Sequence, residues 1–324
     1  MGQKSGDTSM LRILLISAVI LVAIGAALLH FRFDLAVAAL STDSPPPLLD
    51  KRELSASERW FDDYYTIDSI DERTHVIGEP RASGPVFSYL IEGRDRAILF
   101  DIGYPSANIL PVVESLTDKP VLAVPSHLHY DHVGNLERFE QIALLDTPQR
   151  RAQMNGDLFS PTHTQYLGSA EGHDIPSWKI TKWLSDGETI DLGDRTIRVV
   201  FTPGHTDESI SVWDEANDQF FTGDYIYEGP LYAFLPNSSL SDYLKVAENL
   251  LLTLPRETRL YTAHRMNITG TPVLEMRDIV ALRDTLEAVR DGDMAGSGFF
   301  PTRYPVNERI DLDADIPWYQ DWVN

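Results

Sequence analysis

The hydrophobic residues of this chain form one long uninterrupted run, followed by many short groups. The run extends over seventeen residues, from Ile13 to Leu29, and begins almost at the start of the sequence. A helix needs about 17–25 apolar residues to cross a bilayer, whereas the core of a signal peptide needs about 7–15. The run has no amphipathic period, which speaks against a helix buried in a soluble core. Residues 1–33 are therefore predicted to be a membrane anchor or a signal segment.

The residues that flank this run indicate where the rest of the chain lies. Lys4 and Arg12 precede it, and basic residues mark the cytoplasmic side of a span. We therefore expect a membrane-anchored protein whose remaining part is extracytoplasmic, in the periplasm if the cell is Gram-negative. Ala36-Val37-Ala38 fits the small-x-small pattern of a cleavage site, so secretion after cleavage of the leader is the alternative.

Residues 34–72 are expected to be a linker and a lead-in to the main domain. The stretch "STDSPPPLLD" at 41–50 is polar and rich in proline, which is typical of a semi-rigid spacer. Residues 51–72 are mixed and charged, and here we expect a helical lead-in.

From residue 73 onward, short apolar groups alternate with turn residues. The segments "THVIGEP", "VFSYLIEG", "AILFDIG" and "VLAVPS" predict strands, "ETIDLGDRTIRVVFTPGH" and "SISVWDEANDQFFTGD" predict two hairpins, and "RLYTAH" predicts a further strand. Apolar residues recur at a helical period in "SLSDYLKVAENLLLTL" and "PVLEMRDIVALRDTLEAVRDG". Two strand-rich runs, each followed by helices, predict an α/β fold: a four-layer αββα sandwich over 73–295. Residues 150–182 resemble an insertion, and 296–324 form a C-terminal tail.

Composition limits the classes of partner. The chain has 324 residues and no cysteine, so disulfides, a thiolate nucleophile and Cys-ligated metals are excluded. The formal net charge is −22, and residues 1–33 hold three basic and one acidic residue, so the remainder carries about −24. Such an acidic surface repels phosphate backbones, which argues against nucleic acid as a partner.

Potential metal ligands gather at the ends of predicted strands. The segment "SHLHYDH" at 126–132 follows one strand, and single ligand residues follow three others. The full set is His127, His129, Asp131, His132, His205, Asp224 and His264. Imidazole and carboxylate ligands without thiolate suit zinc first, with manganese, iron or cobalt as alternatives. Seven ligands suffice for two ions if one carboxylate bridges them.

These motifs resemble those of the metallo-β-lactamase superfamily. The pattern H-x-H-x-D-H at 127–132, "TPGHT", "FFTGD", "YTAH" and "ILFDIG" with Asp101 occur in the family's order, and the resemblance covers about residues 73–290. It implies the sandwich of that family. By this resemblance His127, His129 and His205 would hold one zinc ion. Asp131, His132 and His264 would hold a second, Asp224 would bridge the two, and Asp101 would orient a ligand or a water.

Departures from the pattern indicate a branch of the superfamily. Flavo-diiron proteins carry Glu in place of His129, and the largest class of true metallo-β-lactamases uses a Cys ligand that this chain lacks. The "GD" containing Asp224 is similar to the glyoxalase II, lactonase and acyl-CoA thioesterase branch. The resemblance implies a hydrolase in which a metal-bound hydroxide attacks an ester, thioester or lactone carbonyl. Asp131 and Asp224 are candidates for proton transfer, and Tyr227 for an oxyanion donor.

The sequence is also compatible with other functions. A strained β-lactam amide could be attacked by the same nucleophile, and phosphodiester cleavage is a further alternative that the negative charge disfavours. The charge also disfavours a polyanionic CoA ester, so the bond class is predicted more firmly than the substrate. The non-enzymatic alternative is a membrane-tethered metal-binding module.

Overall fold

The computed structural model describes residues 5–42, 44–266 and 269–322. The chain divides into two units, Met1–Thr42 and Asp43–Asn324, which are described separately.

The first unit is helical. It consists of α1 (Ser5–His30) and α2 (Arg32–Leu40). Within α1, Arg12–His30 is long and apolar enough to cross a membrane, and none of it is buried in the protein. A signal sequence would have the same length and composition, so both sequence-based alternatives stand. The predicted cleavage site at 36–38 lies within α2, and Lys4 lies outside the described residues.

The first sheet of the second unit has eight strands in the order β1-β2-β3-β4-β5-β6-β7-β11. Their bounds are β1 Arg59–Trp60, β2 Thr66–Asp71, β3 Thr74–Gly78, β4 Phe87–Glu92, β5 Ala97–Phe100, β6 Val121–Val124, β7 Gln141–Leu145 and β11 Lys182–Leu184. The expected helical lead-in over 51–72 is wrong, because these residues form no helix and contain the strands β1 and β2. The β-branched residues Thr66 and Ile67 are buried, and such residues fit a pleated sheet better than a helix.

The second sheet has six strands in the order β12-β13-β14-β15-β17-β18. Their bounds are β12 Thr189–Asp191, β13 Thr196–Phe201, β14 Ile210–Asp214, β15 Gln219–Phe221, β17 Arg259–Tyr261 and β18 Val273–Glu275. The two predicted hairpins are present as the antiparallel pairs β12/β13 and β14/β15. β17 then joins β15 in parallel, so the loops that follow β15 and β17 leave the sheet at the same edge.

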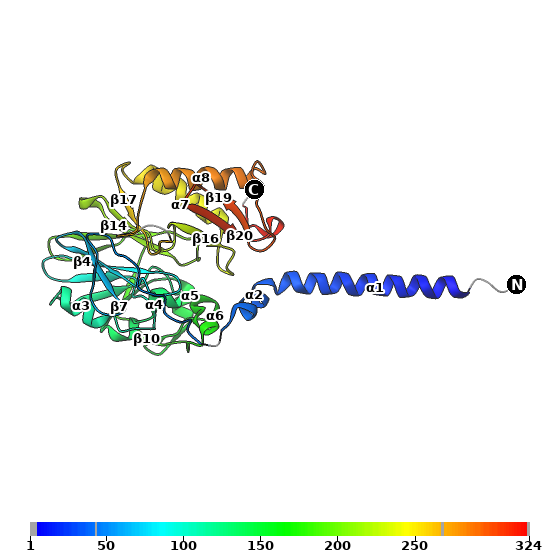
Figure 1. The fold of residues 1–324 in the computed structure, drawn as a ribbon, viewed down its shortest axis with the longest axis horizontal. Coiled ribbons are helices and arrows are strands. Elements are labelled where there is room, and N and C mark those ends of the chain that lie inside the picture. The colour runs from blue at the N-terminus through cyan, green and yellow to red at the C-terminus, as the bar shows by residue number, and fades with distance from the viewer. Residues whose placement is uncertain (1–4, 43, 267–268, 323–324) are drawn as a thin grey trace. The chain divides into compact units, whose positions relative to one another are not determined.

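The two sheets pack face to face with helices outside, which confirms the four-layer αββα sandwich (Figure 1). Side chains of both sheets, such as Phe100 and Phe221, form the core between them. Helix α3 (Leu110–Leu116) covers the first sheet, and α7 (Leu240–Thr253) and α8 (Met276–Arg290) cover the second. The described core residues of this unit all lie between Tyr64 and Ile316, so the unit holds a complete core of its own.

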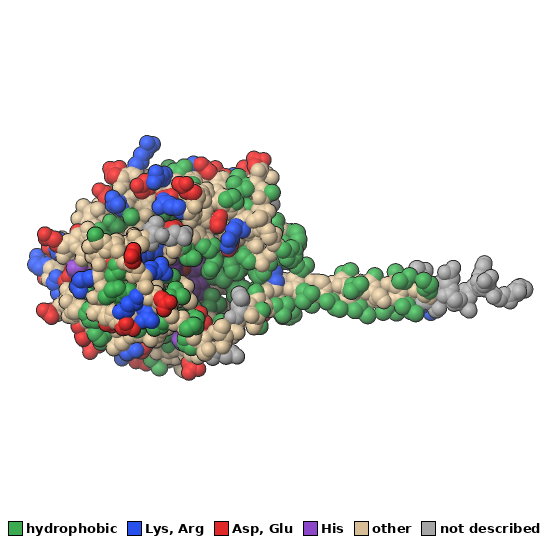
Figure 2. Space-filling model, viewed as in Figure 1, with side chains coloured by type: hydrophobic (Ala, Val, Ile, Leu, Met, Phe, Trp, Pro, Cys, Tyr) green, Lys and Arg blue, Asp and Glu red, His purple; other side chains and the backbone are tan. Residues whose placement is uncertain are grey.

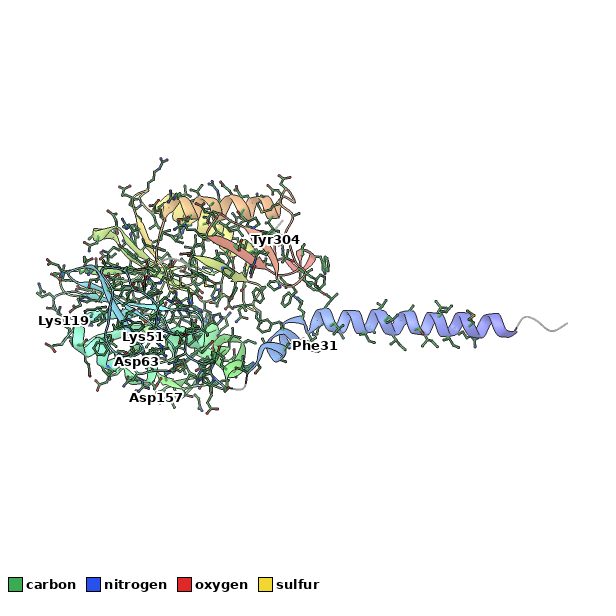
Figure 3. The ribbon with its side chains drawn as sticks, viewed as in Figure 1. Phe31, Lys51, Asp63, Lys119, Asp157 and Tyr304 are labelled. Carbon is green, nitrogen blue, oxygen red and sulfur yellow. The ribbon has the colours of Figure 1, made fainter. Side chains whose placement is uncertain are left out.

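The C-terminal tail is part of this unit. Its strands β19 (Thr302–Pro305) and β20 (Ile310–Ala314) form a small sheet with β16 (Gly229–Ala233), in the order β16-β20-β19. Tyr304 is buried between these strands and α8, whereas charged residues such as Lys119 and Asp157 point outward (Figure 3). The tail therefore fixes the position of β16, which leads away from the predicted ligand Asp224.

The insertion over 150–182 has short elements of its own. They are α5 Pro148–Ala152, β8 Met154–Asn155, β9 Leu158–Phe159, α6 His163–Tyr166 and β10 Trp178–Lys179. Buried Glu208 accepts hydrogen bonds from Thr147 Oγ1 at 2.8 Å, Gln165 Nε2 at 2.9 Å and Arg150 Nε at 3.1 Å. The insertion is thus tied to the loop that carries His205.

Candidate metal centre

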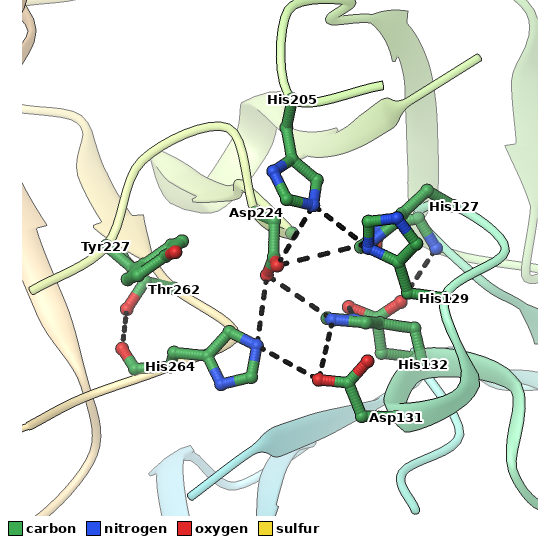
Figure 4. Close-up of polar contacts among 12 residues, drawn as sticks. His127, His129, Asp131, His132, His205, Asp224, Tyr227, Thr262 and His264 are labelled. Carbon is green, nitrogen blue, oxygen red and sulfur yellow. Dashed lines mark hydrogen bonds and ion pairs between the residues drawn. The ribbon is translucent and has the colours of Figure 1, made fainter. Parts of the chain in front are cut away.

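Four loops bring the seven predicted ligands to one edge of the sandwich. The segment 126–132 follows β6 and enters the short helix α4 (Tyr130–Val133). His205 follows β13, Asp224 follows β15 and His264 follows β17. Sites are commonly built on loops at strand ends, because the sheet is rigid while the loops are free to vary. The side chains converge as shown in Figure 4.

Three histidines form the first group of the centre. The Nε2 atom of His127 lies 2.8 Å from Nδ1 of His129, and Nε2 of His205 lies 3.1 Å from the same Nδ1 atom. His127 and His205 are almost fully buried, and His129 is 7% exposed. Three ring nitrogens therefore face one another in a space that is nearly closed to solvent.

Asp131, His132 and His264 form the second group. Asp131 Oδ2 lies 3.5 Å from His132 Nε2 and 3.4 Å from His264 Nε2. Asp224 stands between the two groups. Its Oδ1 atom lies 3.4 Å from His132 Nε2 and 3.3 Å from His264 Nε2, and its Oδ2 atom lies 3.5 Å from His205 Nε2. One carboxylate oxygen thus faces each group, which is the placement that a bridging ligand requires.

The second nitrogen of each ring determines how the ring is turned. His205 Nδ1 donates to the carbonyl oxygen of Tyr232 at 2.9 Å, and His264 Nδ1 donates to that of Pro85 at 2.9 Å. A carbonyl only accepts, so both rings present an unprotonated Nε2 to the centre when neutral. His127 Nδ1 contacts Ser126 Oγ at 2.9 Å. These three partners could not be predicted from the sequence, because every residue has a carbonyl and serine is common in loops.

The pKa values of the histidines differ between the two groups of ligands. Burial lowers the pKa of His127 and His205 and lowers that of His129 to about 3, so the first group is neutral. In the second group burial opposes the charged form, but Asp224 and Asp131 outweigh it and raise the pKa of His264 to about 10. The pKa of His132 is likewise raised. The carboxylates thus favour the charged form of the two rings in the second group, whereas burial favours the neutral form of the rings in the first.

The donor set fits a pair of divalent cations. Asp224 Oδ1 and His132 Nε2 are buried and make no hydrogen bond within the described part of the chain, although buried polar atoms normally do so. Ring nitrogens that face one another at about 3 Å cannot all share protons, but they can share an ion bound at about 2.0–2.1 Å. The structure therefore supports metal binding, while the identity of the ion and the individual ligand roles stay predictions.

Asp101 is placed to orient one of these rings. Its Oδ2 atom lies 3.1 Å from His132 Nδ1, and its Oδ1 atom accepts a hydrogen bond from the backbone N–H of Ser126 at 2.7 Å. The residue is fully buried and has a left-handed backbone, with φ of 59°. It thus connects the end of β5 to two segments of the ligand loop.

We expect Asp101→Asn to weaken metal binding at the second group by about 10–100-fold, because the ring of His132 loses its anionic partner. Asn tolerates a left-handed backbone, so the loop should keep its conformation. Titration of the metal against a competing chelator measures the effect. Asp218→Asn is a matched control, since Asp218 also has a left-handed backbone (φ 52°) but precedes β15 at the opposite end from Asp224. Equal affinities in the two variants would contradict the assigned role.

Tyr227 lies beside the second group of ligands, but its hydroxyl donates a hydrogen bond to a group outside the centre. Its ring centroid is 5.2 Å from that of His264. The buried hydroxyl donates to the carbonyl oxygen of Pro230 at 2.6 Å. A phenol has one proton to donate, so Tyr227 would have to leave Pro230 in order to serve as an oxyanion donor. That role stays a prediction.

Comparisons with known proteins agree with the motifs. The sequence pattern that defines the Metallo-beta-lactamase superfamily matches residues 82–288. A human protein named acyl-coenzyme A thioesterase MBLAC2 is 31% identical over 192 residues, covering 52% of this chain and 68% of its own length. A hydroxyacylglutathione hydrolase of Gloeothece citriformis is 27% identical over 192 residues, covering 53% of this chain and 65% of its own.

Solved structures share the fold. A metallo-β-lactamase from Pontibacter korlensis superposes with a TM-score of 0.51 at 15% identity, over 69% of this chain and 99% of its own. The metallo-β-lactamase IND-7 gives a TM-score of 0.51 at 15% identity, over 70% of this chain and 100% of its own. At this sequence identity, the similarity shows a shared fold and does not bear on function.

Proposed function

The chain belongs to the metallo-β-lactamase superfamily of hydrolases, and on this premise we propose that it hydrolyses an ester, thioester or lactone at a centre of two zinc ions. The observation that carries the proposal is the position of Asp224, with one oxygen toward each group of ligands. His127, His129 and His205 would hold the first ion, and Asp131, His132 and His264 the second. When bound, two such ions lower the pKa of a coordinated water to about 7 and polarise a carbonyl oxygen.

The protein's own groups would position and shield the reaction. The carbonyl oxygens of Tyr232 and Pro85 hold two of the rings so that Nε2 faces the centre. Asp131 is 14% exposed at its side chain and Asp224 is 7% exposed. These two carboxylates are the groups best placed to pass a proton to the leaving group. Because burial excludes most water, their interactions with substrate are stronger than in solution.

Carbonyl substrates fit the site better than polyanions. Arg265 follows His264 directly, but its Nη2 atom donates to Glu58 Oε1 at 2.9 Å and the pair is buried. This arginine is therefore engaged within the protein and is not presented to a phosphate. The human relative is named as a thioesterase and the cyanobacterial one as a hydroxyacylglutathione hydrolase, and both names denote attack on a thioester carbonyl.

Residues 43–324 with bound metal provide the direct test. Metal analysis of the purified protein should give about two ions per chain. A panel of thioester, ester, lactone, β-lactam and phosphodiester substrates should then show turnover of carbonyl esters or thioesters in preference to the others. Preference for a β-lactam or a phosphodiester would replace the proposal, and two ions without any turnover would favour a metal-binding module.

We expect Tyr227→Phe to lower kcat by about 10²-fold if the phenol donates to the oxyanion, with little change in metal content. The variant also loses the hydrogen bond to Pro230, which costs about 1 kcal/mol of folding stability. Comparing kcat with the urea midpoint separates the two effects. An unchanged kcat with a lowered midpoint would show that Tyr227 only fixes the loop.

The N-terminal helix would keep the enzyme at a membrane. We propose that α1 spans the bilayer with Arg12 on the cytoplasmic side, which places the hydrolase outside the cytoplasm, in the periplasm of a Gram-negative cell. The apolar stretch Arg12–His30 supports this proposal. Protease accessibility of residues 43–324 in intact spheroplasts tests it: protection from protease would overturn the orientation, and recovery of the soluble protein without α1 would indicate a cleaved leader.

A further inference from the structure

An aromatic residue of β16, Tyr232, borders the metal centre with its backbone. The carbonyl oxygen of Tyr232 accepts the hydrogen bond from His205, while its side chain is 42% exposed. Burial and the carboxylate of Asp313 raise the pKa of Tyr232, and Asp224 and Asp131 contribute to this shift. The backbone of Tyr232 therefore contacts the metal centre, while its side chain reaches solvent on the C-terminal sheet.

Ring contacts join Tyr232 to two phenylalanines, and a second ring contact lies next to them in the chain. The ring centroids of Tyr232 and Phe234 are 5.4 Å apart, and those of Phe234 and Phe300 are 5.6 Å apart. Phe299, which precedes Phe300 in the chain, is 61% exposed, and Trp318 is 66% exposed. The ring centroids of these two residues are 6.2 Å apart. We call these five residues the aromatic track. Figure 2 shows hydrophobic side chains gathered beside the hollow in which histidine is visible.

The charged side chains that flank Tyr232 in the C-terminal sheet form an ion pair. Arg303 donates from Nε and Nη2 to the two carboxylate oxygens of Asp313, at 2.6 and 2.7 Å. Asp313 pairs in register with Tyr232 on one side and with Arg303 on the other. The sheet face beside Tyr232 therefore presents this bidentate ion pair in place of an isolated charge, which leaves the apolar rings as its main means of recognition.

We propose that the aromatic track holds an unbranched hydrocarbon chain of the substrate while the scissile carbonyl lies at the metal centre. The substrate class would then be an ester or thioester with a long apolar chain, on either its acyl or its alcohol side. The inference rests on the proposed hydrolase function and adds a substrate class to it. Three of the five track residues lie beyond residue 288, outside the superfamily match, so this feature comes from the C-terminal tail.

The track predicts how activity depends on chain length. Each buried CH₂ group contributes enough binding energy to raise affinity about fourfold, and half-burial on an open surface about twofold. We therefore expect kcat/KM to rise about two- to fourfold with each added CH₂ until the chain extends past Phe299. A site that accommodates small polar acyl groups would show no such rise.

p-Nitrophenyl esters from acetyl to dodecanoyl test the acyl side, and acetate esters of ethanol to dodecanol test the alcohol side. The assays use zinc-loaded residues 43–324, because detergent around α1 would itself occupy an apolar track. In Phe300→Ala and Phe299→Ala the ratio of kcat/KM for the longest to the shortest ester should fall at least tenfold. Leu252→Ala is the matched control, since Leu252 is 86% exposed on α7 and belongs to no part of the site. A length dependence that persists in the Phe variants, or is absent from both series, overturns the proposal.

A binding measurement gives an answer even without turnover. Calorimetric titration with dodecanoate and with acetate, at concentrations below the critical micelle concentration, should show binding of dodecanoate alone. Phe300→Ala should weaken this binding at least tenfold while Leu252→Ala leaves it unchanged. Equal affinity in Phe300→Ala and wild type would overturn the track. If no ester is hydrolysed but dodecanoate binds at Phe300, the hydrolase proposal fails and the track stands.

Discussion

Replacing Asp224 by Asn is expected to reduce kcat/KM by on the order of 10³-fold or more and to lower the metal content from about two ions per chain to about one. The carboxylate faces His205 with one oxygen and His132 and His264 with the other. An amide keeps a single acceptor oxygen, so one group loses a ligand. Metal ions stabilise developing charge by several kcal/mol, which corresponds to about three orders of magnitude in rate.

Metal analysis and kinetics on the same preparation measure both parts of this prediction. Asp157→Asn is the control, because Asp157 is exposed in the insertion (Figure 3). Circular dichroism shows whether the variant is folded. A folded Asp224→Asn protein that keeps two ions and full activity would show that the two groups are not bridged through Asp224.

The largest loss of stability is expected at the other end of the sheets, where Asp214→Ala should reduce the free energy of unfolding by about 3–5 kcal/mol. Asp214 Oδ2 accepts a hydrogen bond from Arg195 Nε at 2.7 Å, and both side chains are buried. Arg195 also donates from Nη2 to Thr74 Oγ1 at 2.7 Å and from Nη1 to the carbonyl oxygen of Glu92 at 3.2 Å. It therefore links the second sheet to two strands of the first, and without Asp214 its charge would be buried and unpaired.

A neighbouring pair provides the control for this effect. Arg198 and Glu215 also join β13 to the end of β14, at 3.1 Å, but their side chains are 41% and 61% exposed. Glu215→Ala should therefore cost no more than about 1 kcal/mol. Urea unfolding of residues 43–324 compares the two variants. Similar losses would mean that burial does not set the strength of the Arg195 pair. Recovery in the double variant Arg195→Met/Asp214→Leu would support the unpaired charge as the cause.

The sequence predicted the sandwich and the positions of the ligand residues because both leave local signals. Alternation of apolar and polar residues marks each strand, and the ligands stand directly after strand ends, as His205 does after β13. The pairing of β20 with β16 could not be predicted, since these strands lie about eighty residues apart and neither specifies its partner. Carbonyl groups such as that of Tyr232 also leave no trace in the sequence, although they fix how the histidine rings are turned.

The Arg195 network and the ligand loops lie at opposite ends of the same strands. Asp214 pairs with Gln219 at the start of β15, whereas Asp224 follows its end. Mutations in the loops around the metal centre can therefore accumulate without disturbing the contacts that hold the two sheets in register. Because the two regions are separate, substrate specificity can change during evolution while the sandwich keeps its stability.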